Sequence, residues 1–128
     1  MGRRHYCVTW ADALRGHEEA LLDGGVDGIV NEHAVRSALA RPYHGYHRQI
    51  WKKAAALMHG IVRNHGFADA NKRTSLYLVE LLLVRSGYCL HEDDHAIVET
   101  IVAVAEGQMT YDQLEHWFRE RIVPAPAP

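Results

Sequence analysis

The chain has 128 residues, of which 48% are hydrophobic and 23% are charged. This apolar content is too high for a disordered chain and predicts one compact domain, which at this length buries about two-thirds of the surface that the unfolded chain exposes. The formal net charge of -2 excludes the general positive excess that drives non-specific binding to nucleic acid.

Neither export nor membrane insertion is expected from the sequence. The two cysteines, Cys7 and Cys89, are too few for the disulfide framework of a small secreted domain. The longest apolar stretch, around residues 76–84, is interrupted by Glu80 and is shorter than the roughly 20 residues that span a bilayer. Because the N-terminal segment has no apolar run of signal-peptide length, we expect a cytoplasmic protein.

Helical periodicity and capping residues predict five or six helices. The first helix begins near Trp10 and ends at Asp23, before the Gly24-Gly25 pair that favours a left-handed C-terminus. The residues expected on its inner face are Leu14, Leu21 and Leu22. The second helix begins at Asn31 as its N-cap and ends before Pro42, because the residue before a proline leaves helical geometry.

The middle of the chain contains a loop and the two most apolar helices. Residues 41–48, RPYHGYHR, have no helical period and are expected to form a loop or a short hairpin. A third helix runs over residues 50–64, with its apolar residues on one face. Residues 71–86 are apolar on nearly every side after the first turn, which favours a position in the middle of the bundle.

Two further helices complete the predicted fold. Asp93 or Asp94 caps a helix that runs through Ala105, and its inward residues are expected to be Ile97, Val98, Ile101 and Val104. Thr110 and Gln113 form a capping box for the last helix, which carries Leu114, Trp117 and Phe118. We expect residues 1–121 to form a single all-α domain and residues 122–128 to form a disordered Pro/Ala tail.

Residues 65–74, HGFADANKRT, concentrate polar side chains at the start of the most apolar predicted helix. A helix N-terminus presents unpaired amides and the positive end of the helix dipole, so it binds phosphate groups. Lys72 and Arg73 lie in this first turn although their charge has the wrong sign for the dipole. Their position therefore favours a bound anion.

Two side chains that precede this helix suit chemistry on a phosphate. Asp69 is a hard oxygen ligand of the type that Mg²⁺ takes together with phosphate oxygens. His65 can take a proton from a hydroxyl near neutral pH. Together, these motif residues favour phosphoryl or nucleotidyl transfer. Each residue taken alone also fits a structural role, and Phe67 fits that of a core residue.

The run His65-x-Phe67-x-Asp69-Ala70-Asn71-Lys72-Arg73 resembles the signature motif of the Fic/Doc family. It is most similar to the Doc (death on curing) branch of toxin-antitoxin systems. The similarity extends to the segments LLDGG, VRSALARP, KAAALMHGIVRNH and AEG, and so covers roughly residues 10–121. The resemblance implies an all-α helical bundle of Fic/Doc type around a central buried helix.

The resemblance also implies a role for each residue of the motif. His65 would be the general base for a target hydroxyl, and Asp69 would bind Mg²⁺. Phe67 would anchor the loop in the core, and Ala70 would be a second structural residue of the site. The residues that would hold the phosphates of ATP are Asn71, Lys72, Arg73 and Arg63, with Lys72 and Arg73 also taking part in catalysis.

Two departures from AMP-transferring Fic proteins favour the Doc branch. Those proteins typically read Gly-Asn-Gly-Arg-x-x-Arg, whereas here Lys72 fills the position of the second glycine and Leu76 that of the second arginine. In the Doc branch such a lysine goes with reversed ATP binding, so that the γ-phosphate reaches a Ser/Thr hydroxyl. The implied target is elongation factor Tu, and its phosphorylation would inhibit translation. AMP transfer is the main alternative.

The resemblance further implies a docking flap and a partner. Fic proteins carry a flap that binds an extended target segment by strand-like pairing, and residues 41–48 are expected to be that flap. Its docking residues would be Pro42, Tyr43, His44, Gly45 and Tyr46. A plain connection between helices is equally compatible with this segment.

Some Fic proteins carry an inhibitory pattern in which Ser or Thr is followed four residues later by Glu. This pattern is absent from the sequence. We therefore expect that a separate Phd-like antitoxin, which folds on binding, inhibits the protein.

Two other hypotheses have weaker support. Residues 91–95, HEDDH, match the zinc-protease pattern H-E-x-x-H, which needs a continuous helix, whereas Gly87 and Asp93 predict a helix boundary here. A non-catalytic module that binds nucleotides or nucleic acid could use side chains of residues 41–48 for stacking and phosphate contacts. The negative net charge argues against strong binding to nucleic acid.

Overall fold

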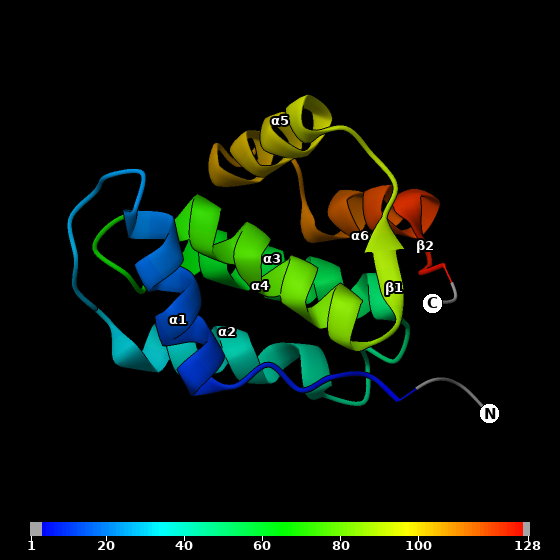
Figure 1. Ribbon diagram of the computed structural model, residues 1–128, viewed down its shortest axis with the longest axis horizontal. Helices are drawn as coiled ribbons and strands as arrows, with labels where there is room; N and C mark the ends of the chain where they lie inside the picture. The colour runs from blue at the N-terminus through cyan, green and yellow to red at the C-terminus, as the bar shows by residue number, and fades with distance from the viewer. Residues whose placement is uncertain (1–3, 127–128) are drawn as a thin grey trace.

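The computed structural model describes residues 4–126, and these residues form an all-α bundle with one small sheet (Figure 1). The helices and strands are α1 (Trp10–Leu21), α2 (Glu32–Ala40), the 3₁₀ turn η1 (Arg41–Tyr43), α3 (Ile50–Asn64), α4 (Asn71–Arg85), β1 (Tyr88–Leu90), α5 (Asp94–Ala105), α6 (Tyr111–Arg121) and β2 (Ile122–Pro124). The predicted fold class is confirmed. None of the described helices is long and apolar enough to span a membrane.

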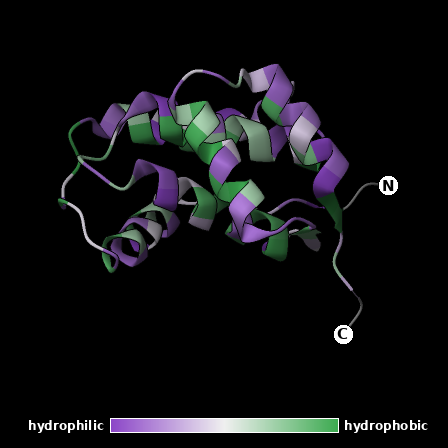
Figure 2. Ribbon diagram, turned by 90° about the horizontal axis from the view of Figure 1, so that it is seen from above, coloured by the Kyte–Doolittle hydropathy of each residue, from purple (hydrophilic) through white to green (hydrophobic). Residues whose placement is uncertain are grey.

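The centre of the bundle is α3, which packs against α2, α4, α5 and α6. Every residue from 54 to 58 is at most 1% exposed. α4 lies beside α3 and also packs against α1 and α5, while Val84 on its outer face is 69% exposed. Residues 71–86 therefore share the middle of the bundle with α3. Figure 2 shows hydrophobic residues along the inner faces of the helices and hydrophilic residues on their outer turns.

The inner face of α1 differs from the prediction. Leu14 and Leu22 are 39% and 79% exposed, respectively. The buried residues of α1 are Ala13, Gly16, His17 and Ala20. The ring of Tyr77 in α4 lies only 2.6 Å from where a Cβ of Gly16 would stand, so the two helices are too close for leucines between them. In α5, Val98 was likewise expected to point inward but is 53% exposed.

Helix N-termini follow the predicted caps. The Asn31 side chain accepts a hydrogen bond from the Ala34 amide, and Asp93 accepts one from Ala96. Thr110 and Gln113 form both hydrogen bonds of a capping box. These bonds fix where α2, α5 and α6 begin, because each satisfies an amide that has no partner inside its helix.

The predicted disordered tail is partly wrong. Ile122–Pro124 forms β2, which pairs in antiparallel register with β1, Leu90 opposite Ile122. Ile122 packs against the hydrophobic core, which gives this segment apolar burial that its composition does not indicate. The last two residues of the expected tail, 127–128, lie outside the described residues.

Candidate functional site

Residues 65–70 connect α3 to α4 and are called the motif loop below. Its two ends, His65 and Ala70, have φ values of 49° and 62°, in the left-handed region. They are the non-glycine residues with positive φ within residues 4–126. Such a conformation is strained for a residue with a Cβ and is concentrated at functional sites. His65 ends α3, its side chain is exposed, and α4 starts directly after Ala70.

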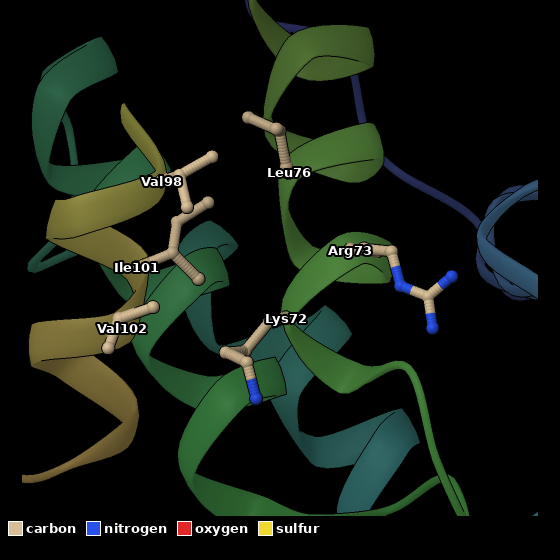
Figure 3. Close-up of a pocket in the computed structure, with 6 residues that line it drawn as sticks. All are labelled: Lys72, Arg73, Leu76, Val98, Ile101 and Val102. Carbon is tan, nitrogen blue, oxygen red and sulfur yellow. The ribbon is translucent and has the colours of Figure 1, made fainter. Parts of the chain in front are cut away.

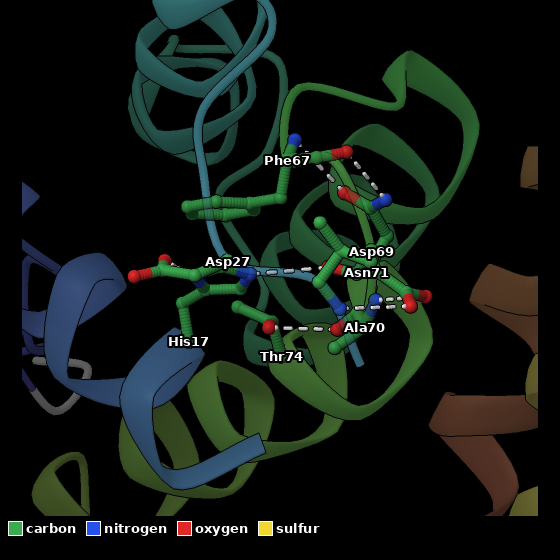
Figure 4. A network of polar contacts seen from close by, with 8 residues as sticks. His17, Asp27, Phe67, Asp69, Ala70, Asn71 and Thr74 are labelled. Carbon is green, nitrogen blue, oxygen red and sulfur yellow. Dashed lines mark hydrogen bonds and ion pairs between the residues drawn. The ribbon is translucent and has the colours of Figure 1, made fainter. Parts of the chain in front are cut away.

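The motif loop is closed by its own side chains. Phe67 is 1% exposed. Its amide donates to Oδ1 of Asn71 at 3.2 Å, and its carbonyl accepts from Nδ2 of Asn71 at 3.0 Å. The hydroxyl of Thr74 donates to the Ala70 carbonyl at 2.8 Å (Figure 4). The side-chain amide of Asn71 was expected to bind the phosphates. In the structure it binds the main chain of Phe67.

A second loop, residues 22–31 between α1 and α2, lies against the motif loop at the same end of the bundle (Figure 1). The amides of Val30 and Asn31 both donate to the Gly66 carbonyl, at 2.9 and 3.0 Å. Ala68 donates to the Gly28 carbonyl at 2.9 Å, and Ile29 forms an antiparallel bridge with Phe67. The α1–α2 loop is therefore paired with the motif loop as a strand would be.

Asp69 is exposed, and both of its carboxylate oxygens accept backbone hydrogen bonds. Oδ1 accepts from Ala70 at 2.8 Å, and Oδ2 accepts from Val26 at 3.2 Å. These two hydrogen bonds hold the pKa of Asp69 below its ordinary value, and the nearby Arg73 and Lys72 lower it further. The group is thus an anion at neutral pH, as a metal ligand must be.

The three cations of the motif region have different surroundings. Arg73 donates to the carbonyls of Ala20 and Gly24, the latter at 2.9 Å, and so binds the end of α1. Arg63 donates to the carbonyl of Ala105, the last residue of α5, at 2.9 Å. Lys72 is exposed, and no hydrogen bond or ion pair joins its ammonium group to another residue within the described range.

A cleft of about 140 Å³ lies between the first turns of α4 and the face of α5 that is turned toward α4 (Figure 3). Its lining residues are Lys72, Arg73, Leu76, Val98, Ile101 and Val102. In Figure 3 the guanidinium group of Arg73 extends away from α5 toward α1, whereas the ammonium group of Lys72 lies on the other side of α4. The first turn of α4 has no side-chain cap, which leaves its amides available to a phosphate.

The expected flap, residues 41–48, does not lie at this site, and that prediction is corrected. Arg41–Tyr43 forms η1 rather than a hairpin. The segment precedes α3, whereas His65 follows α3, and a 15-residue helix is about 22 Å long. Pro42 is buried, and the Tyr43 hydroxyl accepts from the Val8 amide at 2.7 Å and donates to the Tyr6 carbonyl at 2.9 Å.

The remaining flap residues, His44, Gly45 and Tyr46, are exposed at that far end of α3. The segment at the motif is instead the α1–α2 loop, which sequence reasoning missed. The signals available in the sequence were the glycines at 24, 25 and 28 and the apolar Val26, Ile29 and Val30 beside them.

The histidines of HEDDH lie in different elements. His91 follows β1, and its amide donates to the Arg121 carbonyl at 2.7 Å. His95 lies in the first turn of α5, where it contacts Glu99 at 2.9 Å. The continuous helix of a zinc protease is therefore not formed here. Across residues 4–126 there is no group of three or more His, Cys, Asp or Glu side chains that could hold a metal ion.

A family model described as the Fic/DOC family matches residues 11–83 of the chain. The match includes α1, the α1–α2 loop, α2, α3, the motif loop and most of α4. A comparison with curated proteins gave no match.

Proposed function

The chain belongs to the Fic/DOC family, and from this premise we propose that it transfers the γ-phosphate of ATP to a Ser/Thr hydroxyl of a protein target. Members of this family are transferases that modify proteins with groups taken from nucleotides. The choice of the γ-phosphate and the kinase activity are our proposal.

The observation that supports γ-phosphate transfer is the distribution of cations. Arg73 and Arg63 are bound to carbonyls of α1 and α5, and Leu76 stands where an AMP transferase has a second arginine. AMP transfer expels pyrophosphate, whose concentrated negative charge needs several cations. Within the described site, Lys72 is the cation whose charged group has no protein partner. One such cation suits the transfer of a single terminal phosphate better than the release of pyrophosphate.

Groups of this chain can be assigned to each step of the proposed reaction. His65, exposed at the end of α3, takes the proton of the target hydroxyl as its oxygen bonds to the γ-phosphorus. The bond between that phosphorus and the oxygen bridging to the β-phosphate breaks, and ADP leaves. Lys72 and the first-turn amides of α4 hold the phosphate oxygens during the transfer.

Asp69 fits a magnesium ion that is bound together with ATP. Mg²⁺ in such sites is held by one or two carboxylates and otherwise by phosphate oxygens and water. One exposed, ionised carboxylate beside a helix N-terminus, with no larger ligand cluster among residues 4–126, agrees with that mode of binding. When bound, the ion would neutralise phosphate charge.

We place the docking of the target on the α1–α2 loop. Val26 and Val30 are 65% and 70% exposed beside the motif loop, and Ile29 is 39% exposed. Apolar side chains on an extended segment suit the binding of another extended chain by strand addition.

The biological role that we propose is that of a cytoplasmic toxin restrained by a Phd-like antitoxin, with elongation factor Tu as target. Both partners follow from the similarity of HGFADANKRT to the Doc motif. The absence from the sequence of the Ser/Thr-x-x-x-Glu inhibitory pattern supports restraint by a separate chain.

The test is label transfer in a bacterial lysate with Mg²⁺ and ATP labelled on the α or the γ phosphate. We expect γ label alone on protein, lost in His65→Ala and kept in the control His95→Ala, which alters an exposed histidine of α5. Mass spectrometry of the labelled band identifies the target. Transfer of α label would replace the proposal with AMP transfer, and ATP binding without transfer would indicate a non-catalytic module.

A further inference from the structure

α1 carries a buried histidine, His17, that has no part in the proposed reaction. It is 4% exposed and is the largest of the four buried residues of α1. Removing an imidazole from water costs free energy unless its nitrogens have partners. The partners of His17 therefore indicate why a histidine stands at this position.

The first partner is the main chain of the motif loop. Nε2 of His17 lies 3.1 Å from the carbonyl oxygen of Asp69 (Figure 4). Because a carbonyl oxygen only accepts hydrogen bonds, Nε2 carries a proton and donates it. The bond joins α1 to the residue that precedes the left-handed Ala70 and the start of α4.

The ring of His17 also contacts two other parts of the site. It stacks on Phe67, with ring centroids 4.1 Å apart and an angle of 14° between the planes. Nδ1 lies 3.8 Å from Oδ1 of Asp27, in the α1–α2 loop. The Asp27 side chain is 88% exposed, so this contact contributes little by itself. His17 thus lies where α1, the α1–α2 loop and the motif loop meet.

Asp69 is held through its main chain and its side chain at once. His17 binds its carbonyl, and the amides of Val26 and Ala70 bind its carboxylate. The next residue, Ala70, has a strained φ of 62° that rotation of the preceding peptide would relax. Loss of the His17 bond would remove the side-chain donor that holds the Asp69 carbonyl, and rotation of this peptide would shift the carboxylate.

We propose that His17 is a positioning residue that fixes the Asp69 carboxylate against the α1–α2 loop, where this carboxylate would hold Mg²⁺ together with ATP. The consequence for Mg²⁺ rests on the proposed function. The positioning of Asp69 does not, so the two parts are tested separately.

The first experiment measures hydrogen exchange of the Val26 and Ala70 amides in the full chain. His17→Phe keeps an aromatic ring over Phe67 but has no donor, whereas His17→Gln offers an amide donor to the same carbonyl. We expect exchange at both amides to become roughly tenfold faster in His17→Phe, as for the loss of one hydrogen bond. In His17→Gln it stays near the wild-type rate. Unchanged exchange in His17→Phe overturns the proposal.

The amides of α6, far from His17, report global stability in the same experiment. If exchange in α6 rises as much as at Val26 and Ala70, the effect of His17→Phe is general destabilisation, and the proposal is overturned as well.

The second experiment measures calorimetric binding of ATP with Mg²⁺, against ATP with excess EDTA. We expect the gain in affinity due to Mg²⁺ to fall roughly 10–100-fold in His17→Phe, the usual effect of losing support for a metal ligand, and to recover in His17→Gln. Equal Mg²⁺-dependent binding in His17→Phe and wild type overturns the proposal. If the wild type itself binds no ATP with Mg²⁺, the proposed function fails, and hydrogen exchange decides whether His17 positions Asp69.

Discussion

The cations of the site have different tasks, although they lie close together in the sequence. Arg73 and Arg63 donate to main-chain carbonyls at the ends of α1 and α5. A cation at a helix C-terminus interacts favourably with the helix dipole. A hydrogen bond from a charged group contributes about 1.5–3 kcal/mol. Both arginines therefore join neighbouring helices to the site, and in the proposed function Lys72 is the cation that binds phosphate.

This assignment predicts opposite effects of two adjacent substitutions. Arg73→Ala should lower the free energy of unfolding by about 1–3 kcal/mol, because the carbonyls of Ala20 and Gly24 lose their donor. Lys72→Ala should change it by less than about 0.5 kcal/mol, as for other exposed residues without partners, yet abolish γ-label transfer. Urea unfolding and the label assay measure the two effects. Full transfer by Lys72→Ala would contradict the assignment.

At the scale of elements, the motif loop and α2 meet at Gly66. A Cβ on Gly66 would lie 2.3 Å from Cγ2 of Val35 and 3.1 Å from the carbonyl oxygen of Asn31. Both atoms belong to the start of α2. The Gly66 carbonyl also accepts hydrogen bonds from the amides of Val30 and Asn31. The lack of a Cβ at Gly66 therefore allows the start of α2 to lie directly against the motif loop.

Gly66→Ala should therefore separate α2 from the motif loop. We expect a loss of about 1–3 kcal/mol in the free energy of unfolding, the usual cost of overpacking. The matched control is Gly45→Ala, because nothing lies within 4 Å of a Cβ built at Gly45. Thermal unfolding compares the variants. Equal stability of Gly66→Ala and Gly45→Ala would contradict this prediction, because it would show that the Val35 side chain can move aside without a loss of stability.

At the scale of the whole molecule, α3 separates two loops that could each dock a target. The α1–α2 loop lies beside the motif loop, where α3 ends, and residues 41–48 lie where α3 begins. Because α3 packs against helices on most of its sides, the two ends cannot approach each other without unfolding the core. Of the two loops, the α1–α2 loop is the one that lies beside His65, and in the proposed function it is the one that presents the target.

Two substitutions with nearly equal exposure test this arrangement. Val30 is 70% exposed in the α1–α2 loop, and Tyr46 is 68% exposed at the opposite end. Val30→Asp should reduce transfer to the protein target roughly tenfold, because a charge enters an apolar contact, while ATP binding is unchanged. Tyr46→Asp should leave both unchanged. Reduced transfer in Tyr46→Asp with normal transfer in Val30→Asp would return the docking role to residues 41–48.

The sequence by itself determined the features that depend on residues three or four positions apart. The side chains of Asn31, Asp93 and Thr110 cap amides three residues later, so the starts of their helices could be predicted. Apolar periodicity predicted five or six helices and the all-α class for the same reason, and the structure has six α-helices within residues 4–126. The motif residues HGFADANKRT are contiguous, so their place at the end of one helix and the start of the next was also predictable.

Only the tertiary structure decided which distant segments meet. Arg73 binds a carbonyl 53 positions away, Arg63 one 42 positions away, and His17 one 52 positions away. Such contacts depend on how closely the helices pack, as where Gly16 admits the ring of Tyr77. Local spacing carries no information on that packing. For this reason the sequence predicted the place of the motif but not the loop that pairs with it, the partners of its arginines or the contacts of His17.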